Sequence, residues 1–213
     1  MINTLLFDLD GTLINTNELI IASFQDTLDH YYPTKYGRDD IIHFIGEPLE
    51  TSFQRVDPER IEEMVTHYRT HNVAHHDELV TEYPHVKETL QALADAGYRL
   101  GIVTTKRWDT VVMGLELTGL KPFFEVVVTI DDIKNPKPHP EPVQLALKQL
   151  NSLPENAIMV GDSPSDIESG RRAGTKTVGV AWSIKGEAMI REAQPDFVVD
   201  DMQELLAILK DLG

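Results

Sequence analysis

Acidic side chains follow two of the short apolar runs in this 213-residue chain, at the points where those runs end. Asp8 and Asp10 come directly after the first run, and Asp162 and Asp166 follow a later one. Two aspartates this close together at the end of a buried strand need a cation or a proton beside them. Their oxygen atoms form a ligand set that suits Mg²⁺ better than Zn²⁺. The pattern therefore predicts a magnesium site.

Hydroxyl and amino groups stand at comparable positions elsewhere in the chain. Thr104, Thr105 and Lys106 follow the apolar run 100–103, and Lys137 lies in a loop between prolines. Ligands of open α/β sheets bind at the carboxyl ends of the strands. We therefore expect these groups to line the same sheet edge as the aspartates.

The runs that position these residues are apolar on consecutive positions, which is typical of strands covered by helices on both faces. They occupy residues 2–7, 100–103, 126–128, 158–160, 177–181 and 197–199. Helical stripes separate the later runs, and Pro84 is expected to open the first of these helices. The alternation predicts an α/β fold with a doubly wound parallel sheet.

The stretch from about residue 15 to residue 80 breaks this alternation. It contains no convincing strand, and its apolar residues recur at helical spacing around Phe24 and Met64. We therefore expect an α/β core domain of residues 1–14 and 82–213. Residues 15–81 would form a small α-helical cap domain, with hinges near 13–17 and 79–84.

Composition excludes several other functions. Asp and Glu total 35 against 19 Lys and Arg, which gives a formal net charge of −16, and this charge argues against nucleic-acid and anionic-membrane partners. The absence of cysteine excludes disulfides and thiolate metal sites. No apolar run approaches the roughly 20 residues of a membrane span. Because no basic segment precedes the first apolar run, we expect a cytoplasmic protein.

Four segments together resemble the motifs of haloacid dehalogenase (HAD) superfamily phosphatases. Residues 8–12 read Asp-Leu-Asp-Gly-Thr, Thr104 closes a strand, Lys137 is flanked by prolines, and residues 161–166 read Gly-Asp-Ser-Pro-Ser-Asp. They occur in the order of the superfamily's motifs and span most of the chain. The helical insertion resembles the C1 cap of these enzymes, so the resemblance implies a Rossmann-like core with that cap.

The resemblance also implies roles for individual residues. Asp8 is expected to be the nucleophile that forms an aspartyl-phosphate, and Asp10 the general acid and base. Thr104 would donate a hydrogen bond to the phosphoryl group, and Lys137 would offset the charge of Asp8 and the phosphate together.

The remaining implied roles concern the metal and the substrate. Mg²⁺ would be held by Asp8, the Asp10 backbone carbonyl and Asp162, with support from Asp166. Gly11 would let the backbone turn beneath the metal. We count Gly11, Thr105 and Lys106 among the expected substrate-binding residues.

The expected substrate is a small phosphate-containing anion. Within the superfamily, residues 103–106 and 179–186 are most similar to inorganic pyrophosphatases, and the segment 44–50 resembles a loop of phosphoglycolate phosphatases. Phosphoglycolate or another small phosphomonoester is therefore the alternative. Gly161-Asp162, in place of Glu-Asp, favours a hydrolase over a β-phosphoglucomutase-like mutase. A non-catalytic binding protein would have lost Asp8 or Asp10, and a receiver-like signalling module lacks the cap.

Other polar residues have simpler interpretations. His67, His71 and His75 recur every four residues, a spacing that suits a transition metal but is more typical of a solvated helix face. Arg171 and Arg172 are expected to form salt bridges. Lys185 is interpreted as a surface lysine in preference to a substrate contact.

Overall fold

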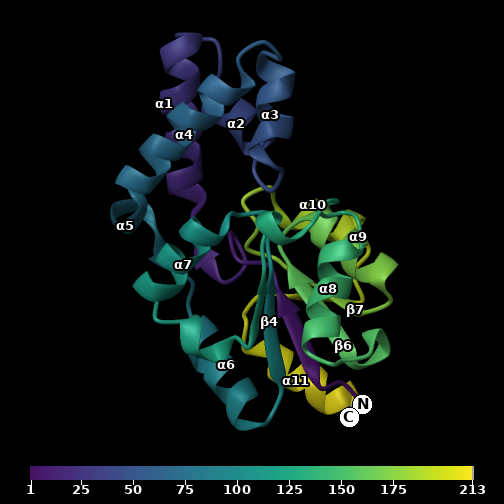
Figure 1. Ribbon diagram of the computed structural model, residues 1–213. Coiled ribbons are helices and arrows are strands. Elements are labelled where there is room, and N and C mark those ends of the chain that lie inside the picture. Colours follow the sequence, from purple (N-terminus) through teal and green to yellow (C-terminus); the bar gives the residue numbers. More distant parts are fainter. Residues whose placement is uncertain (213) are drawn as a thin grey trace.

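The computed structural model describes residues 1–212 and contains a six-stranded parallel sheet (Figure 1). The strand order is β5-β4-β1-β6-β7-β8, so the first strand lies inside the sheet. The strands are β1 (Thr4–Phe7), β4 (Arg99–Val103), β5 (Val126–Val128), β6 (Ala157–Gly161), β7 (Lys176–Val180) and β8 (Phe197–Val199). The expected doubly wound α/β fold is confirmed, with a strand at each of the six apolar runs.

Helices cover both faces of this sheet, because successive side chains of a strand point to opposite sides. Leu5 and Phe7 of β1 belong to one buried cluster, and Leu6 belongs to the other. The first cluster includes residues of α6 (Val86–Asp95), α7 (Trp108–Leu117) and α11 (Glu204–Leu212). The second includes residues of α8 (Glu141–Gln149) and α9 (Pro164–Ala173).

Five helices extend from the sheet edge that carries the ends of β1 and β4 (Figure 1). They are α1 (Asn17–Tyr31), α2 (Arg38–Ile42), α3 (Leu49–Val56), α4 (Ile61–Ala74) and α5 (His76–Leu79). The apolar faces of α1, α2, α3 and α4 share a separate buried cluster in which the Phe24 ring lies 4.8 Å from Tyr68 and 5.3 Å from Phe53, between centroids. This separate core supports a cap; the exact domain boundaries stay a prediction.

The two chain segments that connect the sheet to these helices form a short antiparallel ladder. It pairs β2 (Ile14–Asn15) with β3 (Thr81–Glu82), at the two expected hinges. The sequence did not predict this ladder, because two-residue strands have no measurable periodicity. The ladder ties both connections together on one side of the cap.

The start of α6 differs from the expectation. The helix begins at Val86, and His85 is its N-cap with φ of 58°, so Pro84 precedes the helix instead of opening it. Residues 83–85 form the connection between the end of β3 at Glu82 and the first residue of α6. The predicted position of Pro84 was therefore wrong by two residues.

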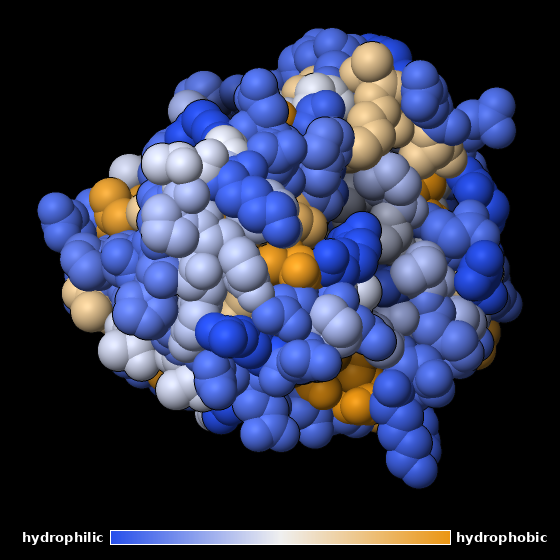
Figure 2. Space-filling view, turned by 90° about the horizontal axis from the view of Figure 1, so that it is seen from above, coloured by the Kyte–Doolittle hydropathy of each residue, from blue (hydrophilic) through white to orange (hydrophobic). Residues whose placement is uncertain are grey.

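The remaining elements are short. They are α10 (Glu187–Glu192) and the 3₁₀ helices η1 (Lys121–Phe123), η2 (Ile130–Asp132) and η3 (Pro154–Asn156). Figure 2 shows that the face seen from above is largely hydrophilic, with hydrophobic residues in separate patches, as expected of a chain with this net charge. Within residues 1–212, no helix combines the length and the hydrophobicity required to span a bilayer.

Candidate active site

The loop after β1 folds tightly beneath the predicted catalytic aspartates. The Asp8 amide donates to Val160 O at 2.9 Å, which extends the pairing of β1 with β6 by one residue. Gly11 has φ of 80°, and a Cβ atom at this position would collide with the Asp162 carboxylate. Glycine is therefore required here both for its backbone conformation and for space. Gly11 lies behind Asp162 and does not line the cavity described below.

Three buried carboxylates meet at the ends of β1 and β6. One oxygen each of Asp8, Asp162 and Asp166 lies within 4.8 Å of the others. Lys137 is buried beside them, and its Nζ lies 2.8 Å from Asp8 Oδ1 and 2.6 Å from Asp166 Oδ1. Nζ also donates to Val103 O at 2.9 Å. All three ammonium hydrogens of Lys137 are thus used within the protein.

This cluster carries unbalanced negative charge. Burial raises the pKa of Asp8 to about 7, although the nearby Lys137 lowers it. Burial and the Asp8 charge raise the pKa of Asp162 well above its ordinary value. Burial alone would lower the pKa of Lys137, but Asp166 and Asp8 outweigh it and raise that pKa. When all three carboxylates are ionised, the single ammonium leaves two negative charges, which one divalent cation would neutralise.

The donor atoms of the cluster fit a hard divalent cation. They are all carboxylate oxygens, the ligand type that Mg²⁺ prefers. Of the three carboxylates, Asp166 forms the most hydrogen bonds within the protein. Its Oδ2 accepts from Ser163 N at 3.0 Å and from Ser163 Oγ at 2.6 Å. Since Lys137 occupies its Oδ1, Asp166 is placed to orient Lys137 and the start of α9.

Asp10 lies outside this carboxylate cluster and has a cation of its own. Its Oδ1 lies 2.8 Å from Lys106 Nζ, and both side chains are only partly exposed. The Lys106 amide donates to Thr104 Oγ1 at 3.1 Å. Within residues 1–212 no acceptor takes the Thr104 hydroxyl hydrogen, so this hydrogen is available to a ligand. Thr104, Thr105, Lys106, Asp10 and Asp8 all line one cavity.

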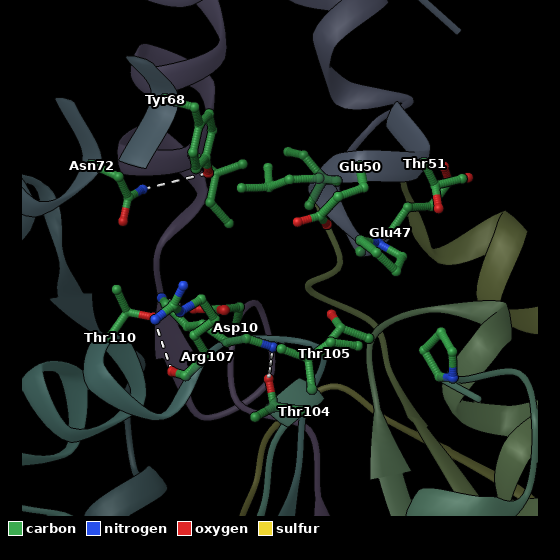
Figure 3. A pocket seen from close by; sticks show the side chains of 18 of the residues that line it. Asp10, Glu47, Glu50, Thr51, Tyr68, Asn72, Thr104, Thr105, Arg107 and Thr110 are labelled. Atoms are coloured by element: carbon green, nitrogen blue, oxygen red, sulfur yellow. Dashed lines mark hydrogen bonds and ion pairs between the residues drawn. The ribbon is translucent and has the colours of Figure 1, made fainter. Parts of the chain in front are cut away.

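That cavity has a volume of about 650 Å³ and lies between the cap helices and the sheet edge (Figure 3). Figure 3 shows Tyr68, Asn72 and Glu50 on the cap side, facing Asp10 and Arg107 on the core side. Asn72 Nδ2 donates to the Tyr68 hydroxyl at 3.4 Å. Glu47 and Glu50 belong to the segment 44–50 that the sequence singled out.

Sequence reasoning missed several residues that line the cavity. Arg69 ion-pairs with Glu50 at 3.1 Å, and Arg107 follows the predicted motif directly. Tyr68 belongs to the apolar stripe around Met64, and Asn72 lies one helical turn further along α4. The spacing of Tyr68 and Asn72 is the signal that places both on one helix face.

Arg171, Arg172 and Lys185 form contacts outside the carboxylate cluster. Arg171 and Arg172 both pair with Glu168, at 2.8 and 2.6 Å, which confirms their expected salt bridges. Lys185 Nζ lies 3.5 Å from His43 O of the cap, outside the cavity lining. Burial lowers the pKa of Lys185.

Known proteins resemble this chain over nearly its whole length. Residues 5–180 match the family model of haloacid dehalogenase-like hydrolases. A curated relative from Bacillus pumilus, pyrophosphatase PpaX, is 63% identical over 208 residues, covering 98% of this chain and 96% of that protein.

Solved structures share the fold. A putative haloacid dehalogenase-like hydrolase from Bacteroides fragilis superimposes with a TM-score of 0.90, at 25% identity, covering 96% of this chain and 100% of that one. A predicted phosphoglycolate phosphatase from Haemophilus somnus gives 0.84, at 26% identity and 98% coverage of both chains. The resemblance seen in the sequence motifs is thereby confirmed, and the chain belongs to the haloacid dehalogenase-like hydrolase family and is a phosphohydrolase.

Proposed function

We propose that this chain hydrolyses inorganic pyrophosphate to phosphate in the presence of Mg²⁺, through an aspartyl-phosphate formed on Asp8. The observation that carries the mechanism is the contact of Lys137 Nζ with Asp8 Oδ1 at 2.8 Å. It fixes one carboxylate oxygen of a buried aspartate at the floor of the cavity. No hydrogen bond occupies Asp8 Oδ2 within residues 1–212, so this oxygen is free to react.

In the first step, Asp8 attacks a phosphorus atom of the substrate and displaces the other phosphate group. A carboxylate is a weak nucleophile, so positioning and charge neutralisation must supply most of the acceleration. Because all three hydrogens of Lys137 are engaged, this lysine holds Asp8 in place instead of donating to the substrate. The free hydroxyl hydrogen of Thr104 is available for a phosphoryl oxygen.

In the second step, water attacks the aspartyl-phosphate and regenerates Asp8. Asp10 is placed to accept a proton from this water, because it lines the same cavity two residues away in the chain. Its Oδ1 lies 2.8 Å from Lys106 Nζ, a contact that holds the side chain at the cavity wall. In the first step the same residue would protonate the leaving group.

The metal in this proposal is Mg²⁺, held by Asp8 and Asp162 together with the backbone carbonyl of Asp10. When bound, it supplies positive charge that offsets the carboxylates and the phosphoryl oxygens. Asp166 supports the site through Lys137 and Ser163.

The choice of pyrophosphate is supported by the relatives called pyrophosphatase PpaX. They are 56–63% identical to this chain over 96% or more of their own length. The cavity also offers cations for a second phosphate group, namely Lys106, Arg107 and Arg69. A phosphomonoester such as phosphoglycolate is the second candidate, because a solved structure with that predicted activity shares the fold.

The test measures phosphate release with Mg²⁺ from pyrophosphate, phosphoglycolate and a set of sugar phosphates. Pyrophosphate is expected to lead by at least about tenfold in kcat/KM, a barrier difference of about 1.4 kcal/mol. If phosphoglycolate leads, the proposed substrate is wrong while the reaction class stands.

The mechanism is tested with Asp8→Asn, which removes the nucleophile but keeps its size. It is expected to abolish phosphate release. It should also abolish the covalent labelling of the protein with phosphate that is detected after the reaction is stopped with acid. Asp95→Asn, in an exposed position near the end of α6, is the matched control and should keep full activity. Full activity of Asp8→Asn would refute the mechanism for every substrate.

A further inference from the structure

The outer face of the cap carries a pair of stacked histidines that the proposed reaction does not use. His71 lies in the last turn of α4, and His75 is the C-cap of that helix. Their ring centroids are 4.1 Å apart, and the ring planes differ by 21°. Residues four apart lie on one face of a helix, so both rings point to the same groove. That groove is separate from the cavity above the sheet.

The hydrogen bond of His75 fixes which ring nitrogen carries its proton. Its Nδ1 lies 3.0 Å from the backbone oxygen of His71. A carbonyl oxygen only accepts, so Nδ1 must be the donor. In the neutral ring, Nε2 then carries a free lone pair.

The same conclusion holds for His71. Its Nδ1 lies 3.1 Å from Ser23 Oγ, and that hydroxyl donates its only hydrogen to Leu19 O at 2.7 Å. Ser23 Oγ therefore accepts from His71 Nδ1, which again leaves Nε2 with the lone pair. Metal-binding histidines have this arrangement, with one nitrogen on the metal and the other donating to a protein oxygen.

We propose that Nε2 of His71 and Nε2 of His75 bind one transition-metal ion of the Cu²⁺, Ni²⁺ and Zn²⁺ class. Because an imidazole lone pair lies in the ring plane, the two rings must turn out of their stack to share the ion. Imidazole nitrogen suits these ions, whereas Mg²⁺ prefers oxygen. Within residues 1–212 the pair has no third side-chain ligand inside the span of one ion, so water completes the coordination. The ion cross-links the last turn of α4 to its C-cap.

The surroundings of the pair favour a cation. The two rings line an open groove of about 830 Å³, into which Asp26, Glu62 and Glu63 also face. The net charge of −16 acts in the same direction. His67, one turn before His71, is already engaged, because its Nε2 lies 2.7 Å from Asp26 Oδ2. His67 is therefore the matched control for the pair.

The test uses electron paramagnetic resonance of the full chain with one equivalent of Cu²⁺ and excess Mg²⁺. Only nitrogen ligands produce nitrogen hyperfine couplings, so an ion in the all-oxygen active site gives none. We expect couplings from two nitrogen atoms in the wild type. His75→Gln and His71→Gln should each reduce this pattern to the couplings of one nitrogen atom or none, and His67→Gln should keep the couplings of two. Calorimetry with Ni²⁺ should show at least a tenfold weaker affinity for His75→Gln.

Three results would overturn the proposal. The first is a wild-type spectrum without nitrogen couplings. The second is an unchanged spectrum in His71→Gln or His75→Gln. The third is loss of the couplings in His67→Gln, which would move the site to another histidine. Circular dichroism of each variant checks that α4 has kept its helix, so that loss of binding is not loss of folding.

Discussion

Lys106 Nζ lies 2.8 Å from Asp10 Oδ1, so the proposed acid and base is paired with a cation that also lines the cavity. The pair connects the loop after β4 to the loop after β1, and these two strands are neighbours in the sheet. One lysine can therefore hold the Asp10 carboxylate and face the substrate. Its removal is expected to affect both tasks.

Lys106→Met is expected to lower kcat/KM for pyrophosphate by about ten- to a hundredfold, since a hydrogen bond to a charged group contributes about 1.5–3 kcal/mol. Steady-state phosphate release measures the effect. Lys87→Met removes an exposed lysine of α6 and should leave kcat/KM unchanged. An unchanged kcat/KM in Lys106→Met would show that neither Asp10 nor the substrate depends on this lysine.

Lys137→Met is expected to destabilise the protein by about 3 kcal/mol, because it leaves the buried Asp8 and Asp166 without their cation. Urea unfolding without metal measures this loss. Lys137 lowers the pKa of the buried Asp8, so without it this pKa will lie further above the value in the unfolded chain. The destabilising effect of Asp8 therefore grows as the pH rises, and the deficit should be larger at pH 8 than at pH 5.

Two comparisons test whether the loss of stability in Lys137→Met is specific to this lysine. Lys148→Met, at an exposed position of α8, should unfold at the wild-type urea concentration. Added Mg²⁺ should restore part of the stability of Lys137→Met by binding the folded state. A deficit that does not change with pH would contradict the role of the two carboxylates.

Gly11→Ala is expected to weaken Mg²⁺ binding by at least about tenfold, the usual effect of disturbing groups that orient metal ligands. The added Cβ would collide with the Asp162 carboxylate, in a backbone conformation that already disfavours alanine. Calorimetric titration with Mg²⁺ measures the affinity. Gly97→Ala is the matched control, because Gly97 has φ of 82° and a Cβ added there would meet no atom within 4 Å.

Gly97→Ala should therefore cost only the backbone strain, about 1–2 kcal/mol of stability. Its Mg²⁺ affinity should equal that of the wild type. Equal Mg²⁺ affinities in both variants would mean that the contact with Asp162 has no part in metal binding.

The core sheet and the core side of the cavity could be predicted because their signals are local. Asp8 and Asp162 each follow a run of consecutive apolar residues, and a parallel sheet brings such strand ends together. No comparable rule applies to the cap side. Tyr68 contributes to the apolar stripe of α4 and also lines the cavity, and only the placement of α4 over the sheet shows the second contact.

The role of Lys137 also depends on contacts between distant parts of the chain. The motif predicted a lysine near the phosphoryl group, but the number of its hydrogen bonds depends on three distant segments. Val103, Asp8 and Asp166 meet its Nζ only in the folded chain. The sequence alone therefore could not show that Lys137 uses all its hydrogens within the protein and positions Asp8.

His85 and Asp201 form a pH-sensitive contact outside the candidate active site. His85 Nδ1 lies 2.6 Å from Asp201 Oδ2, and this contact raises the pKa of His85 and contributes to lowering that of Asp201. Because the pKa of His85 is higher in the folded chain than in the unfolded one, the stability it contributes is present below the unfolded pKa. That stability is lost as the pH rises through the folded pKa of His85. An NMR titration should place this pKa above the ordinary value of 6.5, and Asp201→Asn should return it toward that value. If His85 titrates at the same pH in Asp201→Asn as in the wild type, the contact between α6 and the segment before α11 is not formed in solution.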